Sequence, residues 1–191
     1  MAAAFSNLTR PTVIGIRSQR IIFGVRRRPG KPSQGIVSLQ GLTIPCALGA
    51  GGVKALKREG DGATPLADLR VLGGYFRAGG IVPRRERLGL ARIRPDLGWC
   101  DAPGDRNYNR PVGLPYRASH ERMYRRDHLY DVCIVLDWNI SPRRRNLGSA
   151  IFLHLARPGY APTHGCIALK PRDMARILPL LSKRTVFRVL A

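Results

Sequence analysis

Short apolar runs rich in β-branched residues, separated by turn-forming residues, are the feature that most restricts the fold of this chain. The runs TVIGI, RIIFGV, GIVSLQ and LTIPCALG occupy the first 50 residues, with Arg, Pro, Gly and Ser between them. Two stronger runs, HLYDVCIVLDW and SAIFLHLA, follow later, and TVFRVL lies at the C-terminal end. Runs of this length and composition favour strands, and they predict about eight of them.

One segment departs from this pattern. In KPRDMARILPLLSKR the apolar side chains recur with helical spacing, at Met174, Ile177, Leu178 and Leu181. Pro171 suits the first turn of a helix, and Pro179 is expected to kink it or end it. Many strands and one amphipathic helix near the C-terminus predict a mainly-β barrel or sandwich with the helix packed on one side.

Two stretches are rich in loop-forming residues. One is GAGGVKALKREGDGATPLADL, for which we expect irregular backbone, and the other spans residues 79–127 and includes RPDLGWCDAPGDRNYNRPVGLPY. Loops longer than about 12–15 residues in a compact domain tend to cover or bind something. Residues 79–127 are therefore predicted to be a long functional insertion within a single domain.

The chain is strongly basic, with 33 Lys and Arg residues against 12 Asp and Glu residues and a formal net charge of +21. Such a charge attracts polyanions, so a non-enzymatic protein that binds nucleic acid or cell-surface polyanions is one alternative function. The basic residues cluster beside Pro and Gly, which indicates solvated loop tips. Aromatic residues make up only 7% of the chain and are not interleaved with the basic ones. No specific nucleic-acid site is therefore predicted.

The sequence gives no legible targeting signal. The first 25 residues lack the apolar core of about 7–15 residues that follows a basic start in a signal peptide. No run approaches the roughly 18 apolar residues of a membrane-spanning helix. We therefore expect no transmembrane segment, and nothing in the sequence specifies an oligomeric state.

Four cysteines, Cys46, Cys100, Cys133 and Cys166, occur without any closely spaced pair. Structural zinc sites usually use ligands about two to four residues apart, so no metal or other cofactor is predicted. The even number permits disulfides, but the spacing specifies none. Cys46 and Cys133 lie inside apolar runs and are expected in the core.

Cys166 has a different setting, the stretch ARPGYAPTHGCIALK, in which a turn precedes an apolar segment. A catalytic cysteine needs partial access, a nearby base and backbone N–H groups near its sulfur. Gly165 lacks a side chain and so permits close approach of both substrate and backbone. The N–H groups of Gly165 and Cys166 are candidates for an oxyanion pocket, with Thr163 and His164 bracing the turn. A lone cysteine near a histidine is more often structural, so this hypothesis needs further support.

The candidate base is one of four histidines. In AIFLHLA, Ile151, Leu153 and Leu155 alternate with Phe152 and His154, so His154 is predicted to share a face with Phe152 rather than with the aliphatic residues. His164 is too close in sequence to Cys166 to be the preferred base. His120 and His128 lie in or beside the charged segment SHERMYRRDH, where we expect exposed side chains.

FLH followed by PTHGCIAL, with KREGDGATPLADLRV upstream, resembles the L,D-transpeptidase catalytic domain, also called the YkuD domain. The residues that match its cysteine motif are Thr163, His164, Gly165, Cys166 and Ile167, and those that match its upstream signature are Gly62, Thr64 and Pro65. A subgroup with the longer GWCDAPGDRNYNRPV insertion is the most similar. The resemblance implies a catalytic domain over 28–191 with a mainly-β, barrel-like sandwich fold, preceded by a strand-containing extension over 1–27.

The resemblance also implies a reaction, acyl transfer on peptidoglycan stem peptides without a cofactor. Cys166 attacks the amide before a terminal D-amino acid and forms a thioester, His154 transfers the proton, and backbone amides around His164, Gly165 and Cys166 hold the oxyanion. An amine of a second stem or of a lipoprotein then takes the acyl group. If water takes it, the enzyme is an L,D-carboxypeptidase; another cysteine peptide hydrolase is a further alternative.

Three features differ from the family pattern. The spacing from His154 to Cys166 is shorter than in many members, which leaves the base less firmly assigned than the nucleophile. Ala168 stands where many members have an arginine, so Arg157 or Arg106 is expected to contact the substrate carboxylate, with Thr163 as a further candidate for substrate binding. The family acts in the periplasm or cell envelope, although no signal peptide is legible here.

Overall fold

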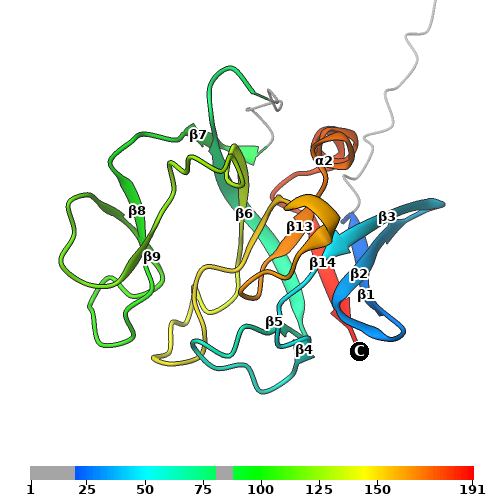
Figure 1. Ribbon diagram of the computed structural model, residues 1–191, viewed down its shortest axis with the longest axis horizontal. Helices are drawn as coiled ribbons and strands as arrows, with labels where there is room; N and C mark the ends of the chain where they lie inside the picture. Colours follow the sequence, from blue (N-terminus) through cyan, green and yellow to red (C-terminus); the bar gives the residue numbers. More distant parts are fainter. Residues whose placement is uncertain (1–19, 81–87) are drawn as a thin grey trace, which may run out of the picture.

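The computed structural model describes residues 20–80 and 88–191 of the chain (Figure 1). The predicted strand TVIGI, most of the first 25 residues and most of the expected 1–27 extension lie outside the described residues. The extension's last residues belong to β1, which pairs with β2 and β14 as part of the main sheet. The domain boundary at residue 28 stays a prediction.

A nine-stranded sheet, in the order β11-β12-β13-β3-β2-β1-β14-β6-β7, forms the body of the molecule. Its strands are β1 (Ile22–Arg28), β2 (Lys31–Leu39), β3 (Leu42–Ala47), β6 (Asp68–Phe76), β7 (Leu90–Arg92), β11 (Val132–Leu136), β12 (Phe152–Leu155), β13 (Ile167–Leu169) and β14 (Val186–Leu190). β11 also pairs with β6, and this pairing closes the sheet into a barrel. The prediction of a mainly-β barrel is confirmed.

The predicted helix is α2 (Pro171–Ile177), the single α-helix among the described elements. Pro171 stands in its first turn, and the chain continues as a 3-10 turn over Leu178–Leu180, which contains Pro179. Met174 and Ile177 are fully buried against the sheet. A proline removes a helical hydrogen bond and clashes with the preceding turn, which accounts for the short helix. No helix in the described part of the chain is long and apolar enough to cross a membrane.

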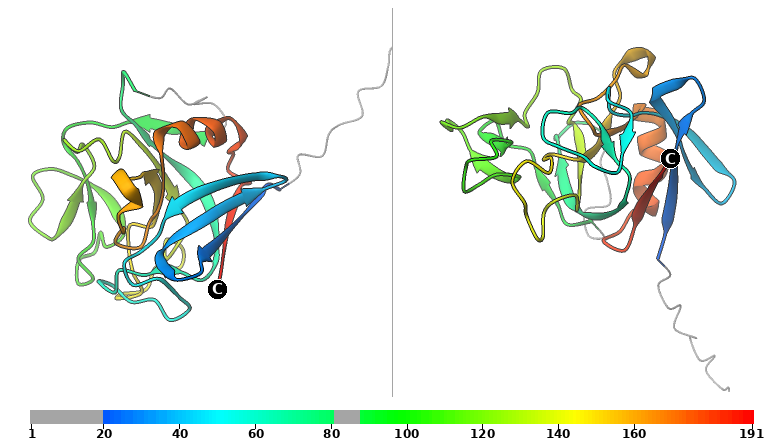
Figure 2. Two further views of the ribbon diagram at one scale, coloured as in Figure 1. Left: turned by 45° about the vertical axis from the view of Figure 1, so that its right-hand side comes forward. Right: turned by 90° about the horizontal axis from the view of Figure 1, so that it is seen from below.

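Residues 79–127 contain more regular structure than the sequence predicted. Beside β7, this stretch forms a three-stranded antiparallel sheet of β8 (Leu97–Cys100), β9 (Arg110–Gly113) and β10 (His120–Arg122). Strands of three or four residues are too short to show a readable alternation of apolar and polar residues. Figures 1 and 2 show this part on the opposite side of the molecule from β1, β2 and β3.

The upstream loop also gains a small amount of regular structure. β4 (Val53–Lys54) and β5 (Thr64–Pro65) form a two-stranded parallel ladder within the stretch expected to be irregular. A further 3-10 turn, Pro158–Tyr160, follows β12. The ladder matters because β5 carries Thr64 and Pro65, two residues of the upstream motif.

Two separate apolar cores result from this arrangement. The inner core fills the barrel and extends beneath α2; Phe23 and Phe187 stack within it, with ring centroids 5.1 Å apart. The outer core lies where residues 93–130 cover the outer face of β11 and β12. Its members are Ile93, Trp99, Met123, Tyr130, Cys133, Val135, Ala150, Phe152 and Cys166. All four cysteines are buried and free, so the prediction that Cys46 and Cys133 are core residues is confirmed.

β12 belongs to both cores because successive side chains of a strand point to opposite faces. Leu153 and Leu155 pack in the inner core, whereas Phe152 packs in the outer one. The predicted alternation along AIFLHLA is thereby confirmed. His154 follows Phe152 by two residues and therefore lies on the outer face, next to the outer core.

Candidate functional site

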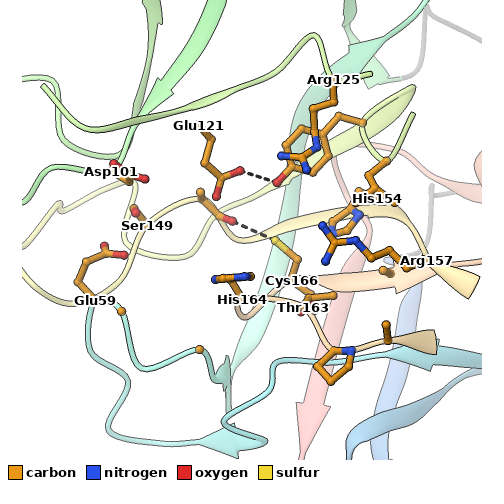
Figure 3. Close-up of a pocket in the computed structure, with 18 residues that line it drawn as sticks. Glu59, Asp101, Glu121, Arg125, Ser149, His154, Arg157, Thr163, His164 and Cys166 are labelled. Atoms are coloured by element: carbon orange, nitrogen blue, oxygen red, sulfur yellow. Dashed lines mark hydrogen bonds between the residues drawn. The ribbon is translucent and has the colours of Figure 1, made fainter. Parts of the chain in front are cut away.

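A cavity of about 410 Å³ opens beside the outer core, and both Cys166 and His154 line it (Figure 3). Residues from four parts of the chain meet there: the loop after β4, the 93–130 segment, β12 with the residue pair before it, and the turn that leads into β13. Ligand pockets commonly have volumes of about 300–1,000 Å³. The cavity is therefore large enough for a few residues of a peptide.

Cys166 immediately precedes β13 and is 5% exposed. Its thiol donates a hydrogen bond to the carbonyl of Ala150 at 3.1 Å and accepts one from the backbone N–H of Phe152 at 3.3 Å. Burial, and then the nearby charge of Glu121, raises the pKa of the Cys166 thiol to about 12. In the resting pocket the sulfur is therefore a neutral thiol that points toward β12.

His154 lies within β12 and is 6% exposed. Its Nδ1 is 2.8 Å from the carbonyl oxygen of Leu155. Because a carbonyl can only accept, Nδ1 carries the proton and Nε2 keeps a free lone pair. Burial lowers the pKa of His154 to about 4. The ring is therefore neutral near pH 7, in the protonation state that a general base requires.

The pairing of β12 with β13 brings these two side chains to one face. The strands run parallel, with Leu153 beside Ile167 and His154 beside Ala168. Cys166, one residue before Ile167, therefore lies beside Phe152, as its hydrogen bond to the Phe152 N–H also requires. Phe152 and His154 share a face, so Cys166 and His154 are diagonal neighbours across the pair. Figure 3 shows both at the pocket.

The turn before Cys166 is held by Thr163. The Thr163 hydroxyl donates to the carbonyl of Cys166 at 2.7 Å and accepts from the N–H of Gly165 at 3.2 Å. The Gly165 N–H therefore already donates a hydrogen bond to Thr163. To bind an oxyanion, it must divide that hydrogen bond between two acceptors or break it. Thr163 therefore shapes the turn, as the sequence indicated.

Gly165 has a requirement that the sequence did not reveal. Its φ is +126°, and a Cβ placed on it would lie 2.6 Å from the carbonyl oxygen of Ala63. An L side chain is therefore disfavoured by both backbone strain and a clash with main chain. The close neighbour is the upstream loop rather than a substrate.

The upstream motif packs directly against this turn. The buried hydroxyl of Thr64 accepts a hydrogen bond from the N–H of Gly49 at 2.9 Å, and Thr163 forms a bridge with Gly49. Earlier in the same loop, buried Lys57 pairs with Asp61 at 2.8 Å, and Asp61 accepts a hydrogen bond from the N–H of Ala63. The upstream motif thus positions the Ala63 carbonyl against Gly165 of the cysteine motif. The two motifs meet there although they are about 100 residues apart in sequence.

The other candidates from the sequence divide into two groups. Exposed His164 and half-exposed Arg157 line the pocket together with Thr163. Arg106 is exposed and lies outside the pocket lining; its carbonyl accepts a hydrogen bond from Arg143. Of these two arginines, the structure brings only Arg157 to Cys166 and His154.

The two histidines expected on the surface also lie outside the pocket lining. His128 is exposed and pairs with Asp131 at 2.9 Å, as expected for a surface side chain. His120 is half-buried rather than exposed, because its Nδ1 contacts the carbonyl of Ala118 at 2.8 Å within β10. No described group of three His, Cys, Asp or Glu side chains is placed to hold a metal ion.

Sequence reasoning missed several pocket residues, chiefly Glu121 and Tyr130. The hydroxyl of buried Tyr130 donates to the Glu121 carboxylate, and its ring meets His154 edge to face at a centroid distance of 5.2 Å. Arg125, Asp101 and Glu59 also line the cavity. Most of these residues lie in the stretches assigned to loops. The available signal was that carboxylates are scarce in this chain, so each one had a higher chance of a specific role.

Comparison with known proteins supports the family resemblance. The sequence model of the YkuD family, the L,D-transpeptidase catalytic domain, matches residues 40–189. Among solved structures, an L,D-transpeptidase from Mycobacterium smegmatis is similar to this chain with 15% identity and a TM-score of 0.40. The match covers 90% of this chain and 59% of that one, so this chain spans little more than half of its length. No curated protein matches in a sequence comparison. Because the family model covers well over half of the sequence, the chain belongs to the YkuD family of L,D-transpeptidase catalytic domains.

Proposed function

We propose that this protein is a cysteine-dependent acyltransferase that acts on peptidoglycan stem peptides in the cell envelope, as an L,D-transpeptidase. The observation that carries the proposal is the placement of the Cys166 thiol and the neutral His154 ring on one face of two paired strands, in one pocket. Membership of the YkuD family supports the choice of substrate. The similarity to the insertion-bearing subgroup stays a prediction.

In the first half of the reaction, the Cys166 sulfur attacks the amide carbonyl of the donor stem while Nε2 of His154 takes the thiol proton. The C–N bond then breaks, His154 gives that proton to the departing D-amino acid, and a thioester remains on Cys166. The thiol has a pKa of about 12 in the resting pocket. Proton transfer is therefore coupled to the attack, in contrast to enzymes that hold a preformed thiolate.

In the second half, an acceptor amine attacks the thioester carbon, and the Cys166 thiol is restored through His154. If water attacks instead, the product is that of a carboxypeptidase. Backbone N–H groups of His164, Gly165 and Cys166 are the candidate donors to the oxyanion. Arg157 lines the pocket and is the candidate for the donor's terminal carboxylate.

Intact-mass analysis after incubation with a tetrapeptide stem or a carbapenem tests the proposal. We expect one acyl adduct, mapped to Cys166, and new amide product when an amine is present. Cys166→Ser should remove both, because a hydroxyl is a far weaker nucleophile than sulfur in this setting. Cys46→Ala, which removes a buried thiol from the inner core, is the matched control and should keep activity.

Full turnover in Cys166→Ser would contradict the assignment of the nucleophile. Acylation by a panel of generic peptides, together with none by the stem peptide, would instead favour a cysteine peptide hydrolase of another class. Product formed only by water would favour an L,D-carboxypeptidase.

A further inference from the structure

The pocket around Cys166 has an unexpected distribution of charge. The chain carries 12 acidic residues against 33 basic ones, yet three carboxylates, Glu59, Asp101 and Glu121, line this one cavity. Figure 3 shows these three on one side of Cys166, with His154, Arg125 and Arg157 on the other. A basic protein thus places an acidic surface beside its candidate nucleophile.

These three carboxylates also differ in their partners from most other acidic residues of the described chain. Asp105 is the other described carboxylate outside an ion pair, and it accepts hydrogen bonds from the Asn107 N–H and the Tyr116 hydroxyl. Seven carboxylates form ion pairs with Lys, Arg or His, namely Asp61, Asp68, Asp96, Asp127, Asp131, Asp137 and Asp173. None of the three pocket carboxylates is in an ion pair within the described residues. Glu121 and Glu59 accept hydrogen bonds from neutral tyrosine hydroxyls, Tyr130 and Tyr108.

Within the described part of the chain, Asp101 lacks a hydrogen-bond partner for one of its carboxylate oxygens. Its Oδ1 atom is buried and has no hydrogen-bond partner among the described residues. A buried carboxylate oxygen without a partner is costly, and such a group in a native structure requires an explanation. A donor supplied by a bound molecule is the explanation that agrees with its place in the pocket wall.

Glu121 raises a separate question, because its charge opposes the chemistry of Cys166. The charge of this carboxylate contributes to the raised pKa of the thiol, after burial. A carboxylate that faces a nucleophilic sulfur disfavours the thiolate. Lys57 acts on the thiol pKa in the opposite direction but has the smaller effect. A cation bound beside Glu121 offsets the remaining effect of the carboxylate.

We propose that Glu121, assisted by Asp101, binds the ammonium group of the acceptor amine and holds it beside the thioester on Cys166. The inference rests on the proposed function and adds the residues that select the acceptor. Hydrogen bonds between an ammonium group and a carboxylate are roughly twice as strong as neutral ones. An ammonium group also supplies up to three donors, enough for both carboxylates.

The position of Glu121 favours the acceptor over the donor as the source of this ammonium group. Glu121 and Cys166 line the same cavity, so a cation held by Glu121 lies in the cavity that also holds the acyl group. The opposite side, with Arg157, suits the carboxylate of the donor. Aminolysis then forms the C–N bond and breaks the C–S bond. Of the two protons that the ammonium group loses, one returns to the sulfur through His154 and the other goes to solvent.

Water does not need a cation site, so the acidic side should control how the thioester is divided between aminolysis and hydrolysis. The test uses the full chain, acylated with a tetrapeptide stem, with glycinamide as the primary-amine acceptor. The ratio of amide product to hydrolysed product is measured for the wild type, Glu121→Gln and Asp101→Asn. Asp173→Asn is the matched control, because Asp173 lies on α2 and pairs with Arg176 outside the pocket lining.

We expect the ratio to fall roughly 10-fold or more in Glu121→Gln, from the usual strength of a charged hydrogen bond. A smaller fall is expected in Asp101→Asn and none in Asp173→Asn, while the Cys166 adduct still forms in all of them. Asp101→Asn keeps the test decisive if the Glu121→Gln variant fails to fold. The Oδ1 atom of Asp101 has no hydrogen bond with the described residues that this substitution could break.

An unchanged ratio in both pocket variants, with normal acylation, would overturn the ammonium site and leave the proposed function standing. A wild-type protein that forms no adduct with the stem peptide would overturn the proposed function, and this inference with it.

Discussion

The inner and outer cores are built on the same strands but differ in chemistry. The inner core consists almost wholly of aliphatic and aromatic side chains within the barrel. The outer core contains Cys166 and Tyr130, and its edge opens into the pocket. Leu153 and His154 are adjacent in β12 but face these two different surroundings. The comparison indicates that the barrel fixes backbone positions, whereas reactive groups are carried on its outer face.

Polar side chains connect the outer core to the site. Buried Asn109 accepts hydrogen bonds from the indole N–H of Trp99 and from the N–H of Ala150, both at 3.0 Å. Ala150 in turn accepts the Cys166 thiol. The 93–130 segment is therefore linked to Cys166, the proposed nucleophile, through one asparagine. Such a buried network is stabilising only when its members are satisfied.

Two substitutions in β12 should separate the roles of the cores. His154→Gln is expected to lower turnover by roughly two to four orders of magnitude, the usual contribution of a positioned base, with little loss of folding stability. Leu153→Ala should do the reverse and cost about 2–5 kcal/mol of unfolding free energy through the cavity it creates. Stem-peptide turnover and chemical denaturation measure the two effects.

His128→Gln is the control for the first change, since His128 is exposed and outside the pocket lining. Near-normal turnover in His154→Gln, with a severe loss in His164→Ala or His128→Gln, would show that the base lies elsewhere even if Cys166 is the nucleophile.

Two glycine substitutions should show how tightly the site depends on the upstream loop. Gly165→Ala places a Cβ against the Ala63 carbonyl and puts an alanine at an unfavourable φ. We expect the free energy of unfolding to fall by about 1–3 kcal/mol beyond the cost of the backbone strain. Acylation should also be slower. Gly30→Ala is the matched control, with a φ of +69° and open space around its Cβ. It should show only the strain, about 1 kcal/mol, and full acylation. Equal losses of stability in the two variants would contradict the packing argument.

The smallest expected effect of a substitution concerns the reactivity of the Cys166 thiol in Glu121→Gln. With a pKa of about 12, Cys166 should react with iodoacetamide at a rate that rises about tenfold per pH unit from pH 6 to 9, without a plateau. Glu121→Gln removes a negative charge, which lowers the thiol pKa and should raise the rate several-fold at any one pH. Peptide mapping assigns the label. A plateau below pH 9 in the wild type would mean that the thiolate is stabilised.

The sequence was informative where local pattern determines structure. Alternation along AIFLHLA placed His154 on the face opposite Leu153, and Pro179 marked the end of the helix. Both features depend on residues close in sequence. The motif around Cys166 was legible for the same reason.

The acidic side of the pocket could not be predicted from the sequence, because it depends on contacts between segments that are distant in the chain. Glu121 lies on a three-residue strand whose place is set by pairing with β8, with its residue opposite Trp99. Gly165 was expected to let substrate and backbone approach closely, but the sequence did not identify the neighbour as Ala63, about 100 residues earlier. The spacing of apolar residues within either segment carries no information about contacts with a distant segment.

The separate origins of the pocket walls bear on how a pocket of this kind can diversify. His154 and Cys166 come from a short span of chain anchored in the barrel, whereas Asp101 and Glu121 come from a segment that covers the barrel from outside. Substitutions within that covering segment can alter the acidic side of the pocket, and with it the proposed amine site, without disturbing the strands that hold Cys166. The residues proposed for catalysis and those proposed for selectivity can therefore change independently. Other folds likewise vary their binding loops while the supporting framework stays the same.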